Sequence, residues 1–112
     1  MVALTASAVV LIHFPFSDLS RSKLRPAVVL ADSGRNDWIL CQVTSKAYAD
    51  SSAVSLSQKD FVYGSLDIVS YARPGKLFTA NSELIVRVIG NSKEDTFQEV
   101  IEAVVQLLRK KT

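Results

Sequence analysis

The stretch KLRPAVVL (residues 23–30) sets two cations and a proline directly before a run of apolar, mostly β-branched residues. Similar short runs recur along the first two thirds of the chain, divided by segments rich in Gly, Pro, Asn, Asp and Ser, such as RPG (73–75). This pattern is typical of an all-β protein, whose backbone reverses at the polar segments. We therefore expect strands at AVVLIHF (8–14), PAVVLA (26–31), WILCQVT (38–44), AVSL (53–56), SLDIVSY (65–71), KLFT (76–79) and LIVRVI (84–89).

Length and composition limit what the chain can form. Its 112 residues are 48% hydrophobic, which is enough for one compact core and too little for two, so we expect a single domain over residues 1–112. No window holds the roughly 18 apolar residues of a membrane span, which predicts a cytoplasmic protein without membrane contact. A net charge of +2 permits a nucleic-acid partner without requiring one.

The last twenty residues change to a helical period. Apolar residues recur there at spacings of three and four, and Ser92 stands three residues before Asp95, as an N-cap pair does. Acidic residues begin the segment and basic residues end it, which complements the helix dipole. We expect one amphipathic C-terminal helix that packs on the sheet through Phe97, Ile101, Val104, Val105 and Leu108.

Strand alternation assigns the side chains of residues 38–44 to two faces. Cys41 shares one face with Ile39 and Val43, which favours a buried, inert thiol, and a lone cysteine forms no disulfide within the chain. Gln42 and Thr44 share the other face, toward the polar end of the strand. From spacing alone, a strand that runs out into solvent before the next loop is favoured over a functional site as the explanation of these two residues.

Most familiar catalytic patterns are absent from the sequence. It has no Gly-rich phosphate loop, no cluster with metal-ligand spacing and no evident pair of nucleophile and base, so no cofactor or metal is expected. His13 is the one histidine, and a packing role in its strand is favoured over catalysis. Acidic residues, Asp50 and Asp60 among them, fall mostly in turns, and none is clearly paired. What remains are cations and hydroxyls beside loops, which suit a phosphodiester but are equally typical of solvated loops.

Three blocks together resemble a known family: VVLIHFPFSDLSRSKLRPAVVL (9–30), WILCQVTSK (38–46) and SYARPGKLFT (70–79). In order and spacing they are similar to the MazF/PemK toxins of type II toxin–antitoxin systems, in particular the PemK-like branch. The resemblance implies a mainly β fold, a small SH3-like barrel of the CcdB/MazF type with a C-terminal amphipathic helix, working as a homodimer. It also implies a metal-independent endoribonuclease that cleaves single-stranded mRNA at short sequences, leaves 2′,3′-cyclic phosphate and 5′-hydroxyl ends, and is blocked by a cognate antitoxin.

The resemblance also assigns roles to residues. The arginine of the RP pair and the threonine that ends the third strand are the family's usual catalytic pair, and these motifs fall on Arg25 and Thr44, with Ser45 as a neighbouring candidate. A guanidinium is a poor base at neutral pH, so we expect Arg25 to stabilise charge on the phosphate and to donate a proton to the departing 5′-oxygen. The expected substrate contacts are Phe16, Lys23, Gln42, Lys46, Tyr71 and Arg73.

Two readings from other functional classes stay open. In one, the barrel acts without cutting anything, by binding a protein target such as DNA gyrase. In the other, a related fold without activity serves as a binding module. The RP arginine and the strand-end threonine favour the nuclease, although this chain has Ser7 and Ala8 where family members usually carry Gly followed by an acidic residue.

Overall fold

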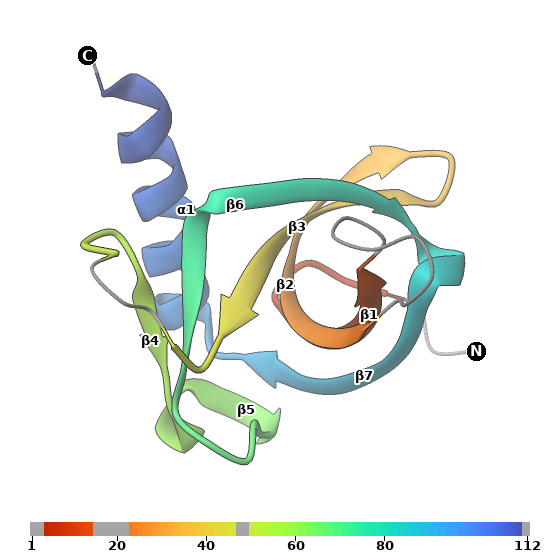
Figure 1. Ribbon diagram of the computed structural model, residues 1–112, viewed down its shortest axis with the longest axis horizontal. Helices are drawn as coiled ribbons and strands as arrows, with labels where there is room; N and C mark the ends of the chain where they lie inside the picture. The colour runs from red at the N-terminus through yellow and green to blue at the C-terminus, as the bar shows by residue number, and fades with distance from the viewer. Residues whose placement is uncertain (1–3, 15–22, 47–49, 111–112) are drawn as a thin grey trace.

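The computed structural model describes residues 4–14, 23–46 and 50–110, which form a mainly β fold with one α-helix, as expected (Figure 1). Its elements follow in the order β1 (Ala8–Phe14), β2 (Lys23–Gly34), β3 (Asp37–Thr44), β4 (Val54–Leu56), the 3₁₀ turn η1 (Gln58–Asp60), β5 (Phe61–Gly64), β6 (Ser70–Asn81), the 3₁₀ turn η2 (Ser82–Leu84), β7 (Ile85–Ser92) and α1 (Glu94–Arg109).

The seven strands form one antiparallel sheet in the order β4-β6-β3-β2-β1-β7-β5. The sheet curls into a half-barrel, with β2, β1, β7 and β6 curving around a common centre and α1 lying outside the curl (Figure 1). The first strand, β1, lies between β2 and β7, so the first and last strands of the described chain are neighbours in the sheet.

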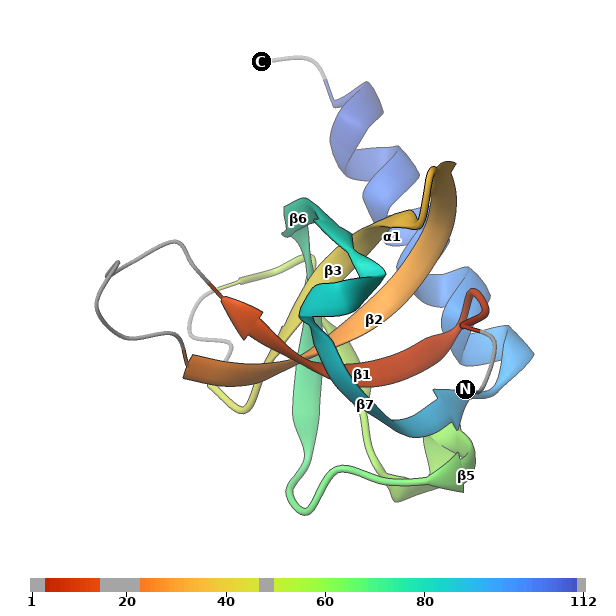
Figure 2. The ribbon, with the colours of Figure 1, turned by 90° about the vertical axis from the view of Figure 1, so that its right-hand side faces the viewer.

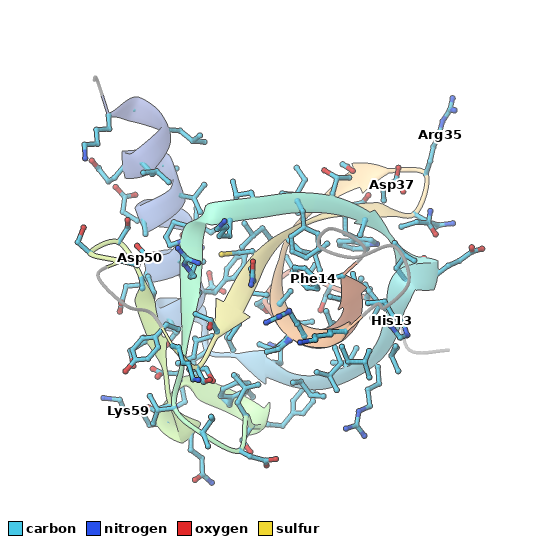
Figure 3. The ribbon with its side chains drawn as sticks, viewed as in Figure 1. His13, Phe14, Arg35, Asp37, Asp50 and Lys59 are labelled. Atoms are coloured by element: carbon cyan, nitrogen blue, oxygen red, sulfur yellow. The ribbon has the colours of Figure 1, made fainter. Side chains whose placement is uncertain are left out.

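The core has two apolar clusters, one on each face of the curled sheet. The cluster on the helix side contains Val28 and Cys41 from the strands and Val100 from α1. The cluster on the inner, concave face contains Ala27 and Val29 of β2, Leu40 of β3 and the residues Val10, Ile12 and Phe14 of β1. Phe14 points into the ring of strands in Figure 3. Successive residues of β2 alternate between the two clusters, so register decides which side chains enter the barrel.

The segment RPG lies inside a strand and not in a turn. Val43 is paired with Ala72 and Cys41 with Leu77, so the residues between Ala72 and Leu77 form a bulge at which β6 turns a corner (Figure 1). The side chain of Pro74 is buried there, and a bulge tolerates the missing N–H of proline. Residues 70–71 and 76–79 are strand as expected, but the predicted break between them was wrong, because both belong to one long strand, β6.

The residues before this strand also differ from the prediction. Residues 65–69 form no strand, and Ile68 and Val69 are 61% and 52% exposed. The strand preceding β6 is β5, which pairs with β7 at the other edge of the sheet.

The C-terminal helix forms as expected and begins with the acidic pair Glu94 and Asp95, but its N-cap differs from the prediction of Ser92. The N-cap is Lys93, without a side-chain hydrogen bond, because the hydroxyl of Ser92 donates to the carbonyl of Ser7 at 2.9 Å and belongs to β7. Phe97, Val100 and Val104 are buried, whereas the end of α1 extends past the sheet and Leu108 is 72% exposed (Figure 2). No helix in the described ranges is long and apolar enough to span a bilayer.

A half-buried carboxylate fixes the start of α1 to η1. Asp60 Oδ2 accepts hydrogen bonds from the backbone N–H and hydroxyl of Ser57, at 2.8 and 3.1 Å, and Asp60 Oδ1 accepts one from the Thr96 hydroxyl at 2.9 Å. Burial alone would raise the pKa of Asp60, but these hydrogen bonds together lower it below its ordinary value. The bonded carboxylate therefore stabilises the contact between helix and sheet.

Candidate active site

Arg25 lies at the end of the row of β2 side chains that line the barrel. It is opposite Ile12 of β1, and by alternation it shares the concave face with Ala27. The preceding residue, Leu24, belongs to the other face and is 49% exposed, while Arg25 itself is half-buried. The hydrogen-bonded sheet on the β1 side thus fixes the backbone of Arg25.

Thr44 ends the adjacent strand on the same face. The register of β2 and β3 pairs Ala27 with Gln42, which is the last pair of these two strands at this end, and Arg25 and Thr44 each lie two residues beyond it on their own strand. Side chains opposite each other in an antiparallel pair lie close together on one face of the sheet. The described structure therefore brings the expected cation and hydroxyl to adjoining strand ends, with Gln42 between them and the inner cluster.

A local turn orients the Thr44 side chain. Its Oγ1 accepts a hydrogen bond from the backbone N–H of Lys46 at 3.1 Å and lies 3.5 Å from the Lys46 carbonyl, at the long limit for a donated bond. The hydroxyl hydrogen is thus only weakly engaged and is available to a phosphate oxygen. Ser45 and Lys46 are both exposed beside it.

The charge of Arg25 is not matched by a carboxylate within the described ranges. Among the described residues, Arg73 and Asp50 form an ion pair, whereas no carboxylate lies at ion-pair distance from Arg25. An arginine with no described carboxylate at ion-pair distance is suited to an anionic ligand.

The other expected contact residues fall into two groups. Tyr71 of β6 is half-buried directly across from Thr44, and Lys23 is exposed at the start of β2, opposite Phe14. These two flank the pair formed by Arg25 and Thr44. Phe16 lies outside the residues that the structure describes.

Arg73 lies elsewhere. Its Nε donates to Asp50 Oδ2 at 2.8 Å, and its side chain lines a pocket together with Leu107 of α1. Asp50 lies on the side of the sheet where α1 packs (Figure 3). The hydrogen bond from Arg73 lowers the pKa of Asp50, whose other oxygen binds the Ser52 backbone N–H and hydroxyl. Sequence analysis assigned Asp50 only to a turn, which is correct for its bond to Ser52, but nothing in the sequence indicated the ion pair. The role of Arg73 in substrate binding stays a prediction.

The remaining titratable residues of the strands behave as packing residues or lie apart from the pair. Cys41 is buried, burial raises the pKa of its thiol to about 12, and its Sγ donates to the Arg73 carbonyl at 3.1 Å. The predicted burial of Cys41 is confirmed, and its inertness stays a prediction. His13 is half-buried in β1, opposite Leu24, and its role stays a prediction.

Known structures share this architecture of a curled antiparallel sheet with one helix outside it. The chain is similar to MazF (Form-I) from Deinococcus radiodurans, with 19% identity, a TM-score of 0.77, and coverage of 98% of this chain and 100% of that one. It is also similar to an endoribonuclease in complex with its cognate antitoxin from a mycobacterial species, with 12% identity, a TM-score of 0.75 and coverage of 98% and 99%. At these identities the likeness establishes the fold, which is that of MazF-like toxins.

The sequence establishes the family. Residues 6–108 match the sequence model of the family described as PemK-like, MazF-like toxin of type II toxin-antitoxin system, and the chain therefore belongs to this family. The resemblance seen in the three sequence blocks is confirmed. Among curated protein sequences no significant relative was found.

Proposed function

We propose that this toxin is an endoribonuclease that cuts single-stranded mRNA at short sequences without a metal ion. One observation carries the proposal: Arg25 and Thr44 extend the inner face of the barrel on adjoining strands, and no described carboxylate neutralises the arginine. Membership of the PemK-like, MazF-like toxins supports it, as does the activity printed for one of the similar structures, an endoribonuclease.

The reaction needs little beyond these two side chains and the RNA itself. The ribose 2′-oxygen forms a bond to the adjacent phosphorus while the bond from phosphorus to the 5′-oxygen breaks, which gives a 2′,3′-cyclic phosphate and a 5′-hydroxyl end. Solvent takes up the proton of the 2′-hydroxyl. Arg25 stabilises the charge on the phosphoryl oxygens and donates a proton to the 5′-oxygen, and solvent then restores that proton. Thr44 donates its hydroxyl hydrogen to a phosphoryl oxygen.

Residues around the pair would hold the rest of the substrate. Lys23 and Lys46 are exposed on either side and meet flanking phosphates, while Tyr71 offers a ring for a base to stack on. Stacking is worth about 1–3 kcal/mol per base and tolerates any base. The amide of Gln42 is the polar group in this row that can recognise a base by hydrogen bonding.

The proposal includes the partners and the compartment of the family resemblance. The toxin acts as a homodimer in the cytoplasm, where its mRNA substrate is, and a cognate antitoxin blocks it. One similar structure is a toxin bound to its antitoxin, and another is a MazE-MazF complex.

Cleavage of a long single-stranded RNA in EDTA tests the proposal. We expect cuts with 2′,3′-cyclic phosphate and 5′-hydroxyl ends, and a rate about 100- to 1,000-fold lower for Arg25→Ala. Arg25→Lys keeps the charge but loses the two-pronged guanidinium, so it should recover only part of the activity. Thr44→Val against Ser45→Ala distinguishes the two hydroxyls, and Lys59→Ala, which removes an exposed cation of η1, is the matched control.

Two results would count against the nuclease. If RNA of many sequences stays intact with the folded protein, binding of a protein target such as DNA gyrase becomes the better hypothesis. If Lys59→Ala slows cleavage as much as Arg25→Ala, the reaction depends on overall charge and not on the strand-end pair.

A further inference from the structure

Two open cavities of about 540 and 350 Å³ lie between the C-terminal half of α1, the turn at residues 50–52 and the bend of β6, which are side by side in Figure 1. They adjoin, because Ser51, Ser52 and Leu107 line both of them. We call their joint surface the helix groove. Arg25 and Thr44 are not among the residues that line it, so the helix groove is separate from the candidate active site.

The helix groove begins close to the candidate active site. Tyr71 is paired with Thr44, and Arg73, which follows Tyr71 by two residues on β6, lines one of the two cavities. Two residues of a strand span about 7 Å. The flank of an RNA strand held at Thr44 can therefore reach the groove along β6.

Cations without a carboxylate partner among the described residues line the helix groove. Lys76 of β6 lines one cavity, and Arg109 and Lys110 at the end of α1 line the other, all three exposed. The carboxylate among the described lining residues is Asp50, which accepts a hydrogen bond from Arg73 Nε at 2.8 Å. The adjoining residues 47–49 have no charged side chain in the sequence. Because a guanidinium has further N–H groups on its terminal nitrogens, Arg73 can still donate to a second anion.

The lining suits an extended polyanion that carries hydroxyl groups. The cations are divided between two adjoining cavities, which fits a row of phosphates better than one small anion. Gln106 lines the larger cavity, and its Nε2 donates to Glu102 at 2.9 Å, which leaves the amide oxygen of Gln106 as an acceptor for a ribose 2′-hydroxyl. The carbonyls at the end of α1 carry partial negative charge, so side chains and not the helix dipole must hold the phosphates.

We propose that the helix groove is a second RNA-binding subsite, which holds phosphates of the single strand that flanks the cleaved sequence. Contacts to phosphates carry no sequence information, so the groove accepts a flank of any sequence. A long single-stranded RNA is then a better substrate than a short RNA that holds only the cleaved sequence. The inference rests on the proposed function, because the flank belongs to the RNA that is cut at Arg25 and Thr44.

Binding of labelled RNA by the full-length protein tests this proposal. The probes are a short fluorescein-labelled single-stranded RNA and the same RNA extended on both sides by uridines, followed by fluorescence anisotropy. Arg25→Ala is present in every protein of this experiment, so the RNA stays intact. We expect the extended RNA to bind more tightly than the short one, and Lys76→Gln with Lys110→Gln to remove most of this gain.

The salt dependence gives the size of the expected effect. Each contact to a phosphate of a single strand contributes about 0.7 to the slope of log affinity against log salt concentration, so loss of two lysines should lower the slope for the extended RNA by about 1.4. In the protein with Arg25 intact, the same two substitutions should raise the KM for the extended RNA toward the KM for the short one.

The matched control is Arg35→Gln with Lys93→Gln, which also removes two exposed cations. Arg35 lies in the hairpin of β2 and β3, far from α1 (Figure 3), and Lys93 is the N-cap at the other end of α1. This control should keep both the gain in affinity and the salt slope of the extended RNA.

Three outcomes would overturn the proposal. The extended RNA binds no more tightly than the short one, or the control loses as much affinity as the groove variant, which makes total charge the cause. In the third, a peptide of alternating Glu and Leu binds the groove and RNA does not. RNA that binds through the groove but is never cut contradicts the proposed function alone, whereas cleavage by a groove variant that binds as the wild type does contradicts this inference alone.

Discussion

Asp60 provides the sharpest test of how the helix is held on the sheet. Its carboxylate accepts three hydrogen bonds, two from Ser57 and one from Thr96, at 2.8–3.1 Å. Bonds to a charged group contribute about 1.5–3 kcal/mol each, and we take about 1 kcal/mol because water reaches this half-buried group. Asp60→Ala should therefore lower the free energy of unfolding by about 3 kcal/mol. Asp60→Asn keeps the shape but loses the charge and should cost about 1–2 kcal/mol.

The pH dependence follows from the lowered pKa of Asp60. A carboxyl group whose pKa is lower in the folded state contributes its full stabilisation above the ordinary Asp value of about 3.9. That contribution is lost as the pH falls through the lowered folded value. The difference between wild type and Asp60→Asn should therefore be largest at neutral pH and should shrink below about pH 4.

Urea unfolding followed by circular dichroism at pH 7, 5 and 3 measures this difference. The control is Asp67→Asn, which alters an exposed carboxylate and should change the unfolding free energy by less than about 0.5 kcal/mol. The reasoning is refuted if Asp60→Asn is as stable as the wild type at pH 7, or if its deficit grows in acid.

Three further predictions concern the core and the strands. Cys41, buried and with a pKa raised to about 12, should resist a thiol reagent in the folded protein and react at once in denaturant; rapid labelling without denaturant would contradict its burial. Gly64→Ala should cost about 2 kcal/mol or more in urea unfolding, because φ is +72° and a Cβ would lie 2.1 Å from the carbonyl oxygen of Ile89; an unchanged midpoint would show that β5 moves freely. Val100→Ala should cost about 2 kcal/mol at the interface of helix and sheet, against little change for exposed Leu108→Ala, by the same measurement.

Strand alternation predicted the two faces of β3 correctly, and with them the position of Thr44. It did so because side chains of a pleated strand alternate between the two faces of the sheet. One set of β3 side chains packs in the cluster on the helix side, and the other set packs in the cluster inside the barrel. Cys41 and Val43 go to the helix side for this reason. The placing of Arg25 and Thr44 on adjoining strands depends on the register between β2 and β3, which is a long-range property that one strand's sequence does not contain.

The errors have a common physical cause. Ile68 and Val69 have high strand propensity but no partner strand, since β6 begins only at Ser70. Pro74 was predicted to separate two strands, but it lies in a bulge of one strand, with its side chain buried. Proline has no backbone N–H, and at a bulge no partner strand requires one. Ser92 was taken as a cap, whereas its hydroxyl bonds the carbonyl of Ser7. In each case a contact distant in sequence overrode a local preference.

The place of β1 between β2 and β7 has a consequence for synthesis of the protein. Ala8 is paired with Asn91, so β1 can form hydrogen bonds along its second edge only after β7 has been synthesised. Contacts of such large sequence separation slow folding. A nascent chain on the ribosome therefore cannot complete this sheet before β7 has been synthesised.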